Sequence, residues 1–329
     1  MLNTIVLFLH RAIVQGIPLL FGSTGETITE KSGNLNLGIP GIMYVGGVSG
    51  VIGAFFYEKS LNGAPINPVL GILLPLLASL LGSCLMSLIY SFLTITLRAN
   101  QNVTGLVLTT FGVGIGNFFG GSLATLFGEG GSLALTATSN LFRKSLPFAS
   151  STGYFGEIFF SYGFLAYVAI ILAILTSFFF KKTKKGLSLR AVGENPATAD
   201  AAGINVITYK YVATCVGGMI AGLGGLYFIM DYTNGVWSNG GFGDRGWLAV
   251  ALVIFTIWRP NFGIFGSILF GGLYIVYLFI PGLGRSSQEL FKMLPYIVTI
   301  IVLVFISMKK RRENQPPQSL GLNYFRDDR

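Results

Sequence analysis

Long apolar stretches, separated by short polar connections, recur along nearly the whole chain. A helix needs about 20 apolar residues to cross a hydrocarbon core of about 30 Å, and most of the stretches have that length. We therefore predict an all-α integral membrane protein, a polytopic helical bundle of about nine transmembrane segments. The seventh segment is short for a full crossing, and the first contains His10, Arg11 and Gln15. The expected segments are about 5–21, 38–57, 69–97, 103–127, 155–180, 207–231, 246–259, 262–281 and 290–308.

Composition agrees with this class, and the distribution of charge orients the chain. The 329 residues are 52% hydrophobic and 11% charged, whereas soluble domains carry roughly 25% charged residues. Basic residues concentrate in 181–190 and 309–312, and an excess of Lys and Arg marks cytoplasmic loops. An odd number of crossings then puts the N-terminus outside and the C-terminus in the cytoplasm. The net charge of +9 reflects this bias and attraction to anionic membrane lipid rather than binding of nucleic acid.

Several kinds of chemistry are missing from the sequence. The two cysteines, Cys84 and Cys215, lie inside apolar stretches and are expected to pack there without a disulfide. The single histidine and the lack of clustered Cys or His argue against a metal site. No G-x-x-x-x-G-K-[ST] run is present to hold nucleotide phosphates. We therefore expect no cofactor in this chain, and any ATP that drives it must be bound by a partner subunit.

The chain has 45 glycines, nearly double the usual share of about 7%. Many recur four residues apart within the apolar segments. Lipid tails are as apolar as leucine, so membrane helices associate by close contact, which small residues four apart permit. We expect these glycines mainly to pack helices together: Gly46 and Gly50, Gly112, Gly116 and Gly120, and Gly218 and Gly222.

A basic connection over 181–206 contains a predicted short helix. Asn195 is a good N-cap, Pro196 suits the first helical position, and Gly203 can adopt the left-handed conformation that ends a helix. The helix would contain about seven residues and be roughly 10 Å long. A compact helix on the cytoplasmic face offers a rigid surface for another protein, and the expected partner is a motor.

Two further connections are unusually polar. The stretch 25–41 joins the first two apolar segments, and 234–247 precedes the seventh. Irregular polar backbone near a membrane is tolerated inside protein, in a cavity or outside the core, so 25–41 is either a cavity-lining break or an ordinary cytoplasmic turn. Asp244 and Arg245 are adjacent in sequence and are expected to pair with other partners, because charges at this depth usually face a cavity or the bundle interior.

Three motifs, in this order, resemble those of a known family. They are Glu30-Lys31-Ser32-Gly33-x-x-Asn36-x-Gly38, Leu189-Arg190-Ala191-Val192-Gly193-Glu194-Asn195-Pro196-x-x-Ala199-x-x-Ala202-Gly203-Ile204-Asn205-Val206, and Asp244-Arg245-Gly246-Trp247-x-Ala249-x-Ala251-x-x-Ile254-Phe255-x-x-Trp258-x-Pro260. Over about residues 15–305 the chain resembles the permeases of ABC importers in the branched-chain amino acid and simple sugar class. Within that class it is most similar to the shorter permease of nucleoside importers.

The resemblance implies roles for particular residues. The loop would couple to a cytoplasmic ABC ATPase through Glu194, Asn195, Pro196, Ala199, Ala202 and Gly203. The first two helices and 234–260 would border the translocation path, with Asn34, Asn36, Asn117, Asp244 and Arg245 as candidates to line it. Each candidate also has a structural interpretation: Asn117 can bond a neighbouring helix, Arg245 can cap helix carbonyls, and Trp237 and Trp247 can anchor at the interface.

The resemblance also suggests the solute and the partners. Monosaccharide permeases usually carry Asp-Leu-Ser-Val-Gly where this chain has Asn34 to Gly38, which favours a nucleoside over a simple sugar or another small polar solute. Pro40 departs from the Gly-x-Glu-Gly pattern of the nucleoside type and alters the start of the second helix. Expected partners are the ATPase, a second, non-identical permease and an extracellular solute-binding lipoprotein. Residues 1–308 would form the permease domain and 309–329 a basic cytoplasmic tail.

Two other classes fit less well. A secondary transporter driven by an ion gradient usually carries ionisable residues within its helices and repeated halves, and the apolar stretches contain few acids. A membrane-embedded enzyme requires a catalytic pair within the helices. We therefore predict a permease subunit without an ATPase site or enzymatic activity of its own.

Overall fold

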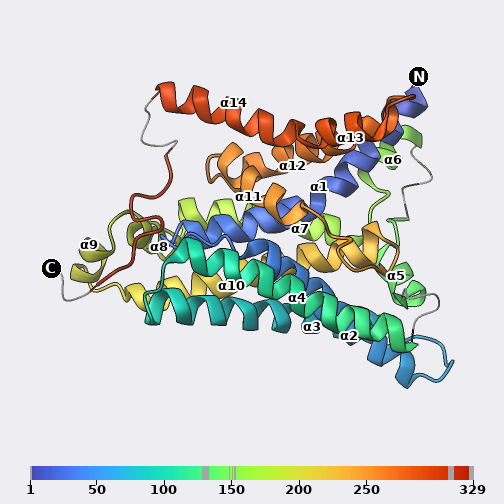
Figure 1. The fold of residues 1–329 in the computed structure, drawn as a ribbon, viewed down its shortest axis with the longest axis horizontal. Coiled ribbons are helices and arrows are strands. Elements are labelled where there is room, and N and C mark those ends of the chain that lie inside the picture. The colour runs from blue at the N-terminus through green and yellow to red at the C-terminus, as the bar shows by residue number, and fades with distance from the viewer. Residues whose placement is uncertain are drawn as a thin grey trace.

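A computed structural model describes residues 2–127, 133–147, 149, 151, 153–309 and 315–325. Long helices lie side by side in an elongated bundle (Figure 1). The helices are α1 (Leu2–Glu30), α2 (Ile39–Ser60), α3 (Pro68–Ser91), α4 (Gln101–Phe127), α5 (Thr136–Phe142), α6 (Gly153–Phe159), α7 (Phe164–Lys182), α8 (Lys184–Glu194), α9 (Pro196–Ala201), α10 (Val206–Tyr227), α11 (Arg245–Phe255), α12 (Pro260–Ile275), α13 (Arg285–Lys292) and α14 (Leu294–Lys309). The two-residue strands β1 (Leu133–Ala134) and β2 (Val236–Trp237) pair antiparallel.

Three long helices continue into short turns of a different pitch. A π-helical turn, η1 (Phe92–Thr96), extends α3, and a second, η2 (Phe228–Tyr232), extends α10. A 3₁₀ turn, η3 (Val276–Phe279), extends α12. Single π-helical turns occur often at functional sites, so the ends of α3 and α10 are places to look for one.

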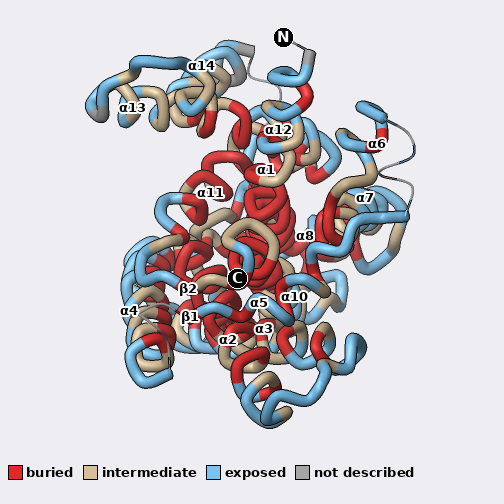
Figure 2. Tube along the Cα trace, turned by 90° about the vertical axis from the view of Figure 1, so that its right-hand side faces the viewer, coloured by how far each residue is buried: buried red, intermediate tan, exposed pale blue. Residues whose placement is uncertain are grey.

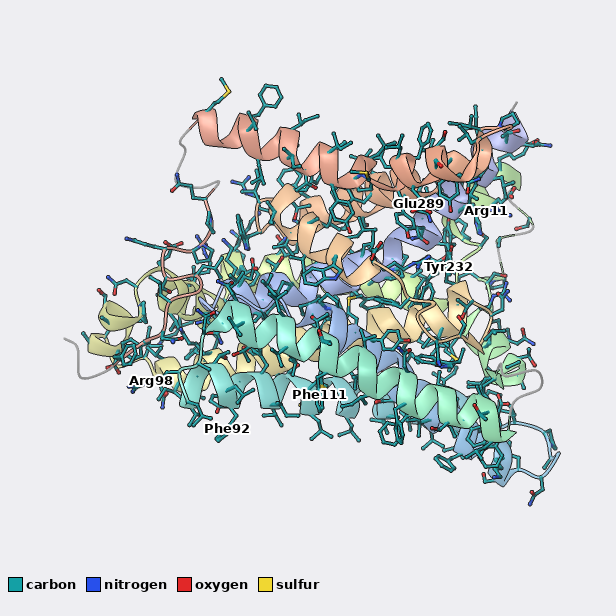
Figure 3. All side chains as sticks on the ribbon, in the orientation of Figure 1. Arg11, Phe92, Arg98, Phe111, Tyr232 and Glu289 are labelled. Atoms are coloured by element: carbon teal, nitrogen blue, oxygen red, sulfur yellow. The ribbon has the colours of Figure 1, made fainter. Side chains whose placement is uncertain are left out.

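The central helices α2 and α10 are buried along most of their length (Figure 2). Helix α1 packs along α10 and α12, α3 packs against both α2 and α10, and α4 covers α2. The outer helices expose large apolar side chains: Leu81 of α3 is 65% exposed, Phe118 of α4 67%, and Phe305 of α14 61%. Phe92 and Phe111 are each 51% exposed on the lower face in Figure 3. Such an apolar outer surface suits contact with lipid.

Eight helical stretches are long and apolar enough to cross a membrane. They are Asn3–Glu30, Ile39–Ser60, Pro68–Thr96, Gln101–Phe127, Phe164–Lys182, Val206–Tyr232, Pro260–Phe279 and Ser286–Phe305. The chain begins at one end of the bundle and its C-terminal residues lie at the opposite end (Figure 1). Termini at opposite ends agree with an odd number of passes if α11 and the connection before it form a ninth pass, in addition to these eight. Which end faces the cytoplasm stays a prediction. Of the basic residues at 309–312, Lys310 to Arg312 lie outside the described residues.

The first segment is longer than the apolar pattern predicts. We expected it to end near residue 21, with 25–41 as a connection, but α1 continues without a break to Glu30. The polar residues are accommodated because their side chains face protein: the hydroxyls of Thr27 and Thr29 donate back to the carbonyls of Ser23 and Gly25, and Glu30 is buried. The connection is therefore restricted to residues 31–38.

Two other segments also differ from the expected ranges. The stretch 155–180 is broken at 160–163, so α6 and α7 are separate helices. The stretch 246–259 forms the helix α11 of 11 residues, which is largely buried and too short to span a hydrocarbon core alone. Helix α11 therefore lies within the bundle as part of a broken pass, between α10 and α12.

The glycine pattern has the packing role predicted for it. A Cβ added to Gly46 would lie 2.5 Å from the Cα of Gly222, so α2 and α10 approach at backbone distance. On α4, the positions of Gly112, Gly116 and Gly120 face Gly41, Tyr44 and Trp237 respectively. These small residues allow α2 to lie in close contact with α10 on one side and α4 on the other.

This packing predicts a position-specific effect of adding one methyl group. A Cβ at Gly225 of α10 would overlap the carbonyl oxygen of Met43, and backbone cannot move aside cheaply. We expect Gly225→Ala to destabilise the protein by about 1–3 kcal/mol, the range for overpacking a core. Gly114→Ala is the matched control, since nothing lies within 4 Å of that position on α4. The midpoint of the unfolding transition in detergent is measured for both variants. Equal midpoints for Gly225→Ala and Gly114→Ala would contradict the close packing at Gly225.

Candidate functional site

The non-helical break between α1 and α2 is held by side chains from elsewhere in the fold. The amide of Leu35 donates to Gln101 Oε1 at 2.7 Å, and the amide of Asn36 donates to Glu26 Oε1 at 3.1 Å. Thr109 of α4 donates to the carbonyl of Leu37 at 2.7 Å. Backbone groups that the break removes from the helical ladder are thus paired with α1 and α4, as burial requires.

The two predicted path residues in this break are buried and take part in the same network. Asn34 Nδ2 donates to Thr214 Oγ1 of α10 at 3.1 Å, and Asn36 Oδ1 accepts from the amide of Gly38 at 2.9 Å. Within the described residues, Asn34 Oδ1 and Asn36 Nδ2 are buried without a hydrogen-bond partner. Asn36 therefore braces the start of α2, while Asn34 keeps a free acceptor beside α10.

Two acidic residues, one helical turn apart, lie in the last turns of α1, next to the break. Glu26 is fully buried and Glu30 is 3% exposed, and the indole Nε1 of Trp258 donates to Glu30 Oε2. The next residue, Lys31, has its pKa lowered to about 8, chiefly by burial and further by the charge of Arg190. Sequence analysis did not assign roles to Glu26 and Trp258, because it left 25–41 open between a cavity-lining break and an ordinary cytoplasmic turn.

A second group of predicted residues lies along α4 and the connection before α11. Tyr44 of α2 donates its hydroxyl hydrogen to Asn117 Oδ1, and the amide of Gly240 donates to the Tyr44 oxygen at 2.9 Å. The ring of Tyr44 lies 5.3 Å from that of Trp237 and 6.3 Å from that of Phe242, centre to centre. Three buried aromatic rings and the partly buried amide of Asn117 thus share one region. Sequence analysis named Asn117 as a candidate and missed Tyr44.

Arg245 binds the same connection from its buried side. Its guanidinium donates to the carbonyl of Phe242 at 2.9 Å and to Gln15 Oε1 at 3.4 Å. It also lies over the rings of Phe228 and Tyr232, at 4.4 and 4.9 Å. Arg245 is only 7% exposed, so its charge is stabilised by carbonyls and aromatic faces. Arg245 therefore has a structural role, but the carbonyls that it binds belong to the connection rather than to a helix end as expected.

Asp244 has a different environment from its neighbour. It is exposed just before α11, and Trp247, Val250 and Ile254, three to four residues apart on that helix, are each partly exposed on it. These four positions form an outward stripe on an otherwise buried helix. The structure therefore groups Asn117 and Asp244 near one connection, and it places Asn34 and Asn36 apart from them, at the break.

The predicted coupling element consists of two helices. We expected one short helix within a loop, but residues 184–194 form α8, capped by Thr183, whose Oγ1 accepts from the amide of Gly186 at 3.0 Å. The start of α9 agrees with prediction, because Asn195 Oδ1 accepts from the amide of Thr198 at 3.0 Å. Gly203 has the positive φ of 82° expected of a helix-ending glycine.

The exposed face of α9 differs in one position from the predicted contact set. Glu194, Asn195, Ala202 and Gly203 are exposed and Pro196 is partly exposed. Ala199 is 3% exposed and packs against Val192 and Val206, so its side chain faces the permease itself. Its small size fits α9 against α8 and α10 rather than offering an outer contact.

The C-terminal residues 315–325 cross this end of the molecule, a feature that composition did not reveal. The amide and hydroxyl of Ser319 both donate to the carbonyl of Gly193, at 3.0 and 2.6 Å. The amide of Gly321 donates to the carbonyl of Gly33 at 3.2 Å, and Tyr324 donates to Asp200 Oδ2 at 2.8 Å. We call this segment the tail strap, since it joins α8, α9 and the break.

Comparison with known proteins identifies the family. The model of the branched-chain amino acid transport system permease component matches residues 8–303. The chain belongs to this permease family. It is 31% identical over 328 residues to the nucleoside ABC transporter permease NupC of Lactococcus lactis, covering 98% of each chain. It is 29% identical over 316 residues to the putative glucose ABC transporter permease TsgC13 of Haloferax volcanii, covering 90% of each.

The guanosine ABC transporter permease NupQ of Bacillus subtilis is 29% identical over 327 residues, covering 96% of each chain. No solved structure matches the chain. Membership of the family, together with the apolar helices, makes the protein a multi-pass membrane permease of an ABC importer. Permeases of this kind are not enzymes, and the ATPase is a separate subunit.

The hydrogen bond of Tyr44 predicts a local effect at the connection before α11. Removing one such bond costs about 0.5–1.5 kcal/mol, so Tyr44→Phe should speed hydrogen exchange of the Gly240 amide roughly two- to twelvefold. Tyr57→Phe, on the same helix, is the matched control, because the Tyr57 hydroxyl accepts from the amide of Asn67 at 3.0 Å instead. Mass spectrometry of peptides after hydrogen exchange measures the exchange rate in each variant. Unchanged exchange at 236–243 in Tyr44→Phe would contradict the contact.

Proposed function

We propose that this permease imports nucleosides. The observation that carries the proposal is the similarity to a nucleoside permease along 98% of both chains. The chemistry of the region around Tyr44 agrees with it, since a nucleoside has a flat base and a ribose rich in hydroxyls. Tyr44 and Trp237 place aromatic rings there, buried in this structure, and Asn117 adds a partly buried amide. A glucose permease is the second candidate, supported by the similarity to TsgC13.

The translocation path runs along α11 and α4, between this chain and a second permease. Asp244, Trp247 and Asn117 are its candidate residues, because Asp244 is exposed and Trp247 and Asn117 are partly exposed near one connection. Polar groups facing hydrocarbon are unfavourable, so a partner must cover them. A second, non-identical permease supplies this cover, as the resemblance to importers with two different membrane subunits suggests. Arg245 and Asn36 support the path from inside the bundle.

The end of the bundle that carries α8, α9 and the tail strap faces the cytoplasm. Its lysines at 181–185 follow the positive-inside rule. There the surface around α9 contacts the ATPase, through Glu194 at the end of α8 and through Asn195 and Ala202, which flank α9. The opposite end, where α1 begins, lies outside and receives the solute from an extracellular binding lipoprotein.

The docking role of α9 predicts that an exposed charge there uncouples transport. Ala202→Arg adds a bulky charge to the exposed face without disturbing the core, whereas Ala199 is unsuitable because it is buried. We expect at least a tenfold loss of ATP-driven uptake and weaker ATPase binding, since small residues allow the helix to fit a groove. Ala64→Arg, on an exposed connection at the other end of α2, is the control. Normal uptake by Ala202→Arg would exclude this face as the contact.

The solute is tested by uptake into proteoliposomes that hold the full complex of permeases, ATPase and lipoprotein. We expect ATP-dependent uptake of a labelled purine or pyrimidine nucleoside, and none of glucose. Uptake should persist when ion gradients are collapsed by ionophores, because ATP drives it. Faster glucose uptake would favour the sugar importer, and uptake that stops with the ion gradient would favour an ion-coupled carrier.

A further inference from the structure

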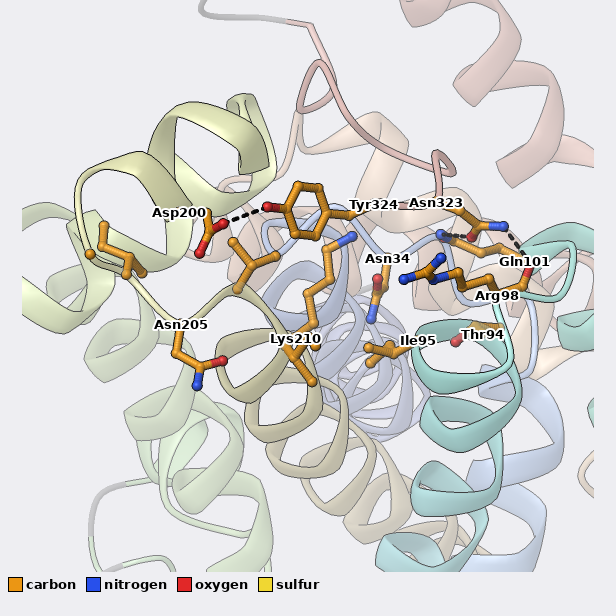
Figure 4. Close-up of a pocket in the computed structure, with 14 residues that line it drawn as sticks. Asn34, Thr94, Ile95, Arg98, Gln101, Asp200, Asn205, Lys210, Asn323 and Tyr324 are labelled. Carbon is orange, nitrogen blue, oxygen red and sulfur yellow. Dashed lines mark hydrogen bonds between the residues drawn. The ribbon is translucent and has the colours of Figure 1, made fainter. Parts of the chain in front are cut away.

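A polar pocket lies beside the break, at the end of the bundle that carries the tail strap. Its volume is about 320 Å³, within the size range of small-ligand sites. The pocket is bounded by the end of α3, the connection from α9 to α10 and the strap (Figure 4). The residues that matter for its chemistry are Asn34, Arg98, Asp200, Lys210 and Tyr324. The proposed transport function uses none of the charged ones.

Lys210 is the most informative residue in this pocket. Its side chain is 3% exposed and extends from α10 toward the pocket interior (Figure 4). Within the described residues, no carboxylate forms an ion pair with its ammonium group and no acceptor binds it. A buried charge without a partner is costly and is normally compensated by a counter-ion. Lys210 therefore places a cation in the pocket wall that an anionic ligand would compensate.

Arg98 adds a second positive charge. Its guanidinium points toward the same space from the opposite wall, with Asn34 between the two cations (Figure 4). Arg98 has a positive φ of 56°, which is unusual for a residue with a side chain, and its guanidinium lies 4.5 Å above the ring of Phe325 in the strap. The single acid in the described lining, Asp200, already accepts a hydrogen bond from Tyr324. The pocket thus has a net positive charge.

The surroundings of the pocket indicate where the anion comes from. Ile207, which lines it, is 55% exposed, and Leu97, next to Arg98, is 58% exposed. Both continue the apolar outer face of α3 and α10, where Leu85 and Val212 are 61% and 56% exposed. An acyl chain can lie along this face while its headgroup enters the pocket.

We propose that this pocket binds the phosphate group of an anionic membrane phospholipid, held between Lys210 and Arg98 and closed by the tail strap. A phosphodiester suits two cations on opposite walls, because lysine and arginine are strong phosphate ligands. The bound lipid would stabilise the junction of α3, α10 and the strap. This proposal does not depend on which solute the permease imports.

The experiment is lipid titration of the purified full complex, followed by native mass spectrometry. Phosphatidylglycerol is the probe, phosphatidylcholine is the zwitterionic control, and inorganic phosphate is the soluble competitor. Hydrogen bonds to charged groups contribute about 1.5–3 kcal/mol, so Lys210→Met and Arg98→Gln should each weaken phosphatidylglycerol binding about ten- to a hundredfold. Lys184→Met, an exposed lysine on α8, should bind within about twofold of the natural protein.

The outcomes separate the alternatives. Lys210→Met should unfold at the same or a higher temperature than the natural protein without added lipid, because it removes an uncompensated buried charge. Phosphatidylglycerol binding that is equal in Lys210→Met, Arg98→Gln and Lys184→Met would overturn the proposal. Inorganic phosphate binding without any phosphatidylglycerol binding would also overturn it and would assign the pocket to a soluble phosphate. If Lys210→Met fails to fold, the exposed Arg98→Gln alone decides.

Discussion

The structure depends on one constraint: a chain that leaves the helical conformation inside a membrane protein must find partners for its backbone within that protein. Residues 31–38 are the clearest instance. Their amides and carbonyls are satisfied by Glu26, Gln101 and Thr109, which come from α1 and α4. The polar side chains that look out of place in an apolar segment are therefore the ones that make the break possible. Arg245 performs the same task for the connection before α11, where it binds the carbonyl of Phe242.

Close helix packing is the second requirement, and it follows from the first. Side chains can reach across to the break only if the helices around it lie near one another. Gly46 and Gly222 let α2 and α10 meet at backbone distance, and Gly105 of α4 faces the backbone of Leu37 in the break. The glycines of this chain thus position the polar network, and they leave little room for side chains between the central helices.

Sequence patterns predicted the elements that rest on local chemistry. The apolar stretches became helices, Asn195 caps α9, and Gly203 has a positive φ. The errors arose where tertiary contacts override local pattern. Helix α1 extends to Glu30 because Asn36 and Trp258 donate hydrogen bonds to its two acids. Ala199 faces inward because α9 packs on Val192. Helix α8 was read as a loop because its basic residues suggested only a charged connection. The tail strap had no sequence signal, since its hydrogen bonds join backbone groups and scattered Ser, Asn and Tyr side chains to partners far away in the sequence.

These contacts connect the proposed motor contact to the break. Gly193 at the end of α8 lies against the backbone of Lys31, where even a Cβ would collide with the Lys31 carbonyl. The strap binds both elements, through Gly193 on one side and Gly33 on the other. A force that moves α8 and α9 must either carry residues 31–33 along or break these hydrogen bonds. The break is bonded in turn to α1, α3, α4 and α10. A displacement at the coupling helices therefore reaches four of the bundle's long helices through direct hydrogen bonds to the break.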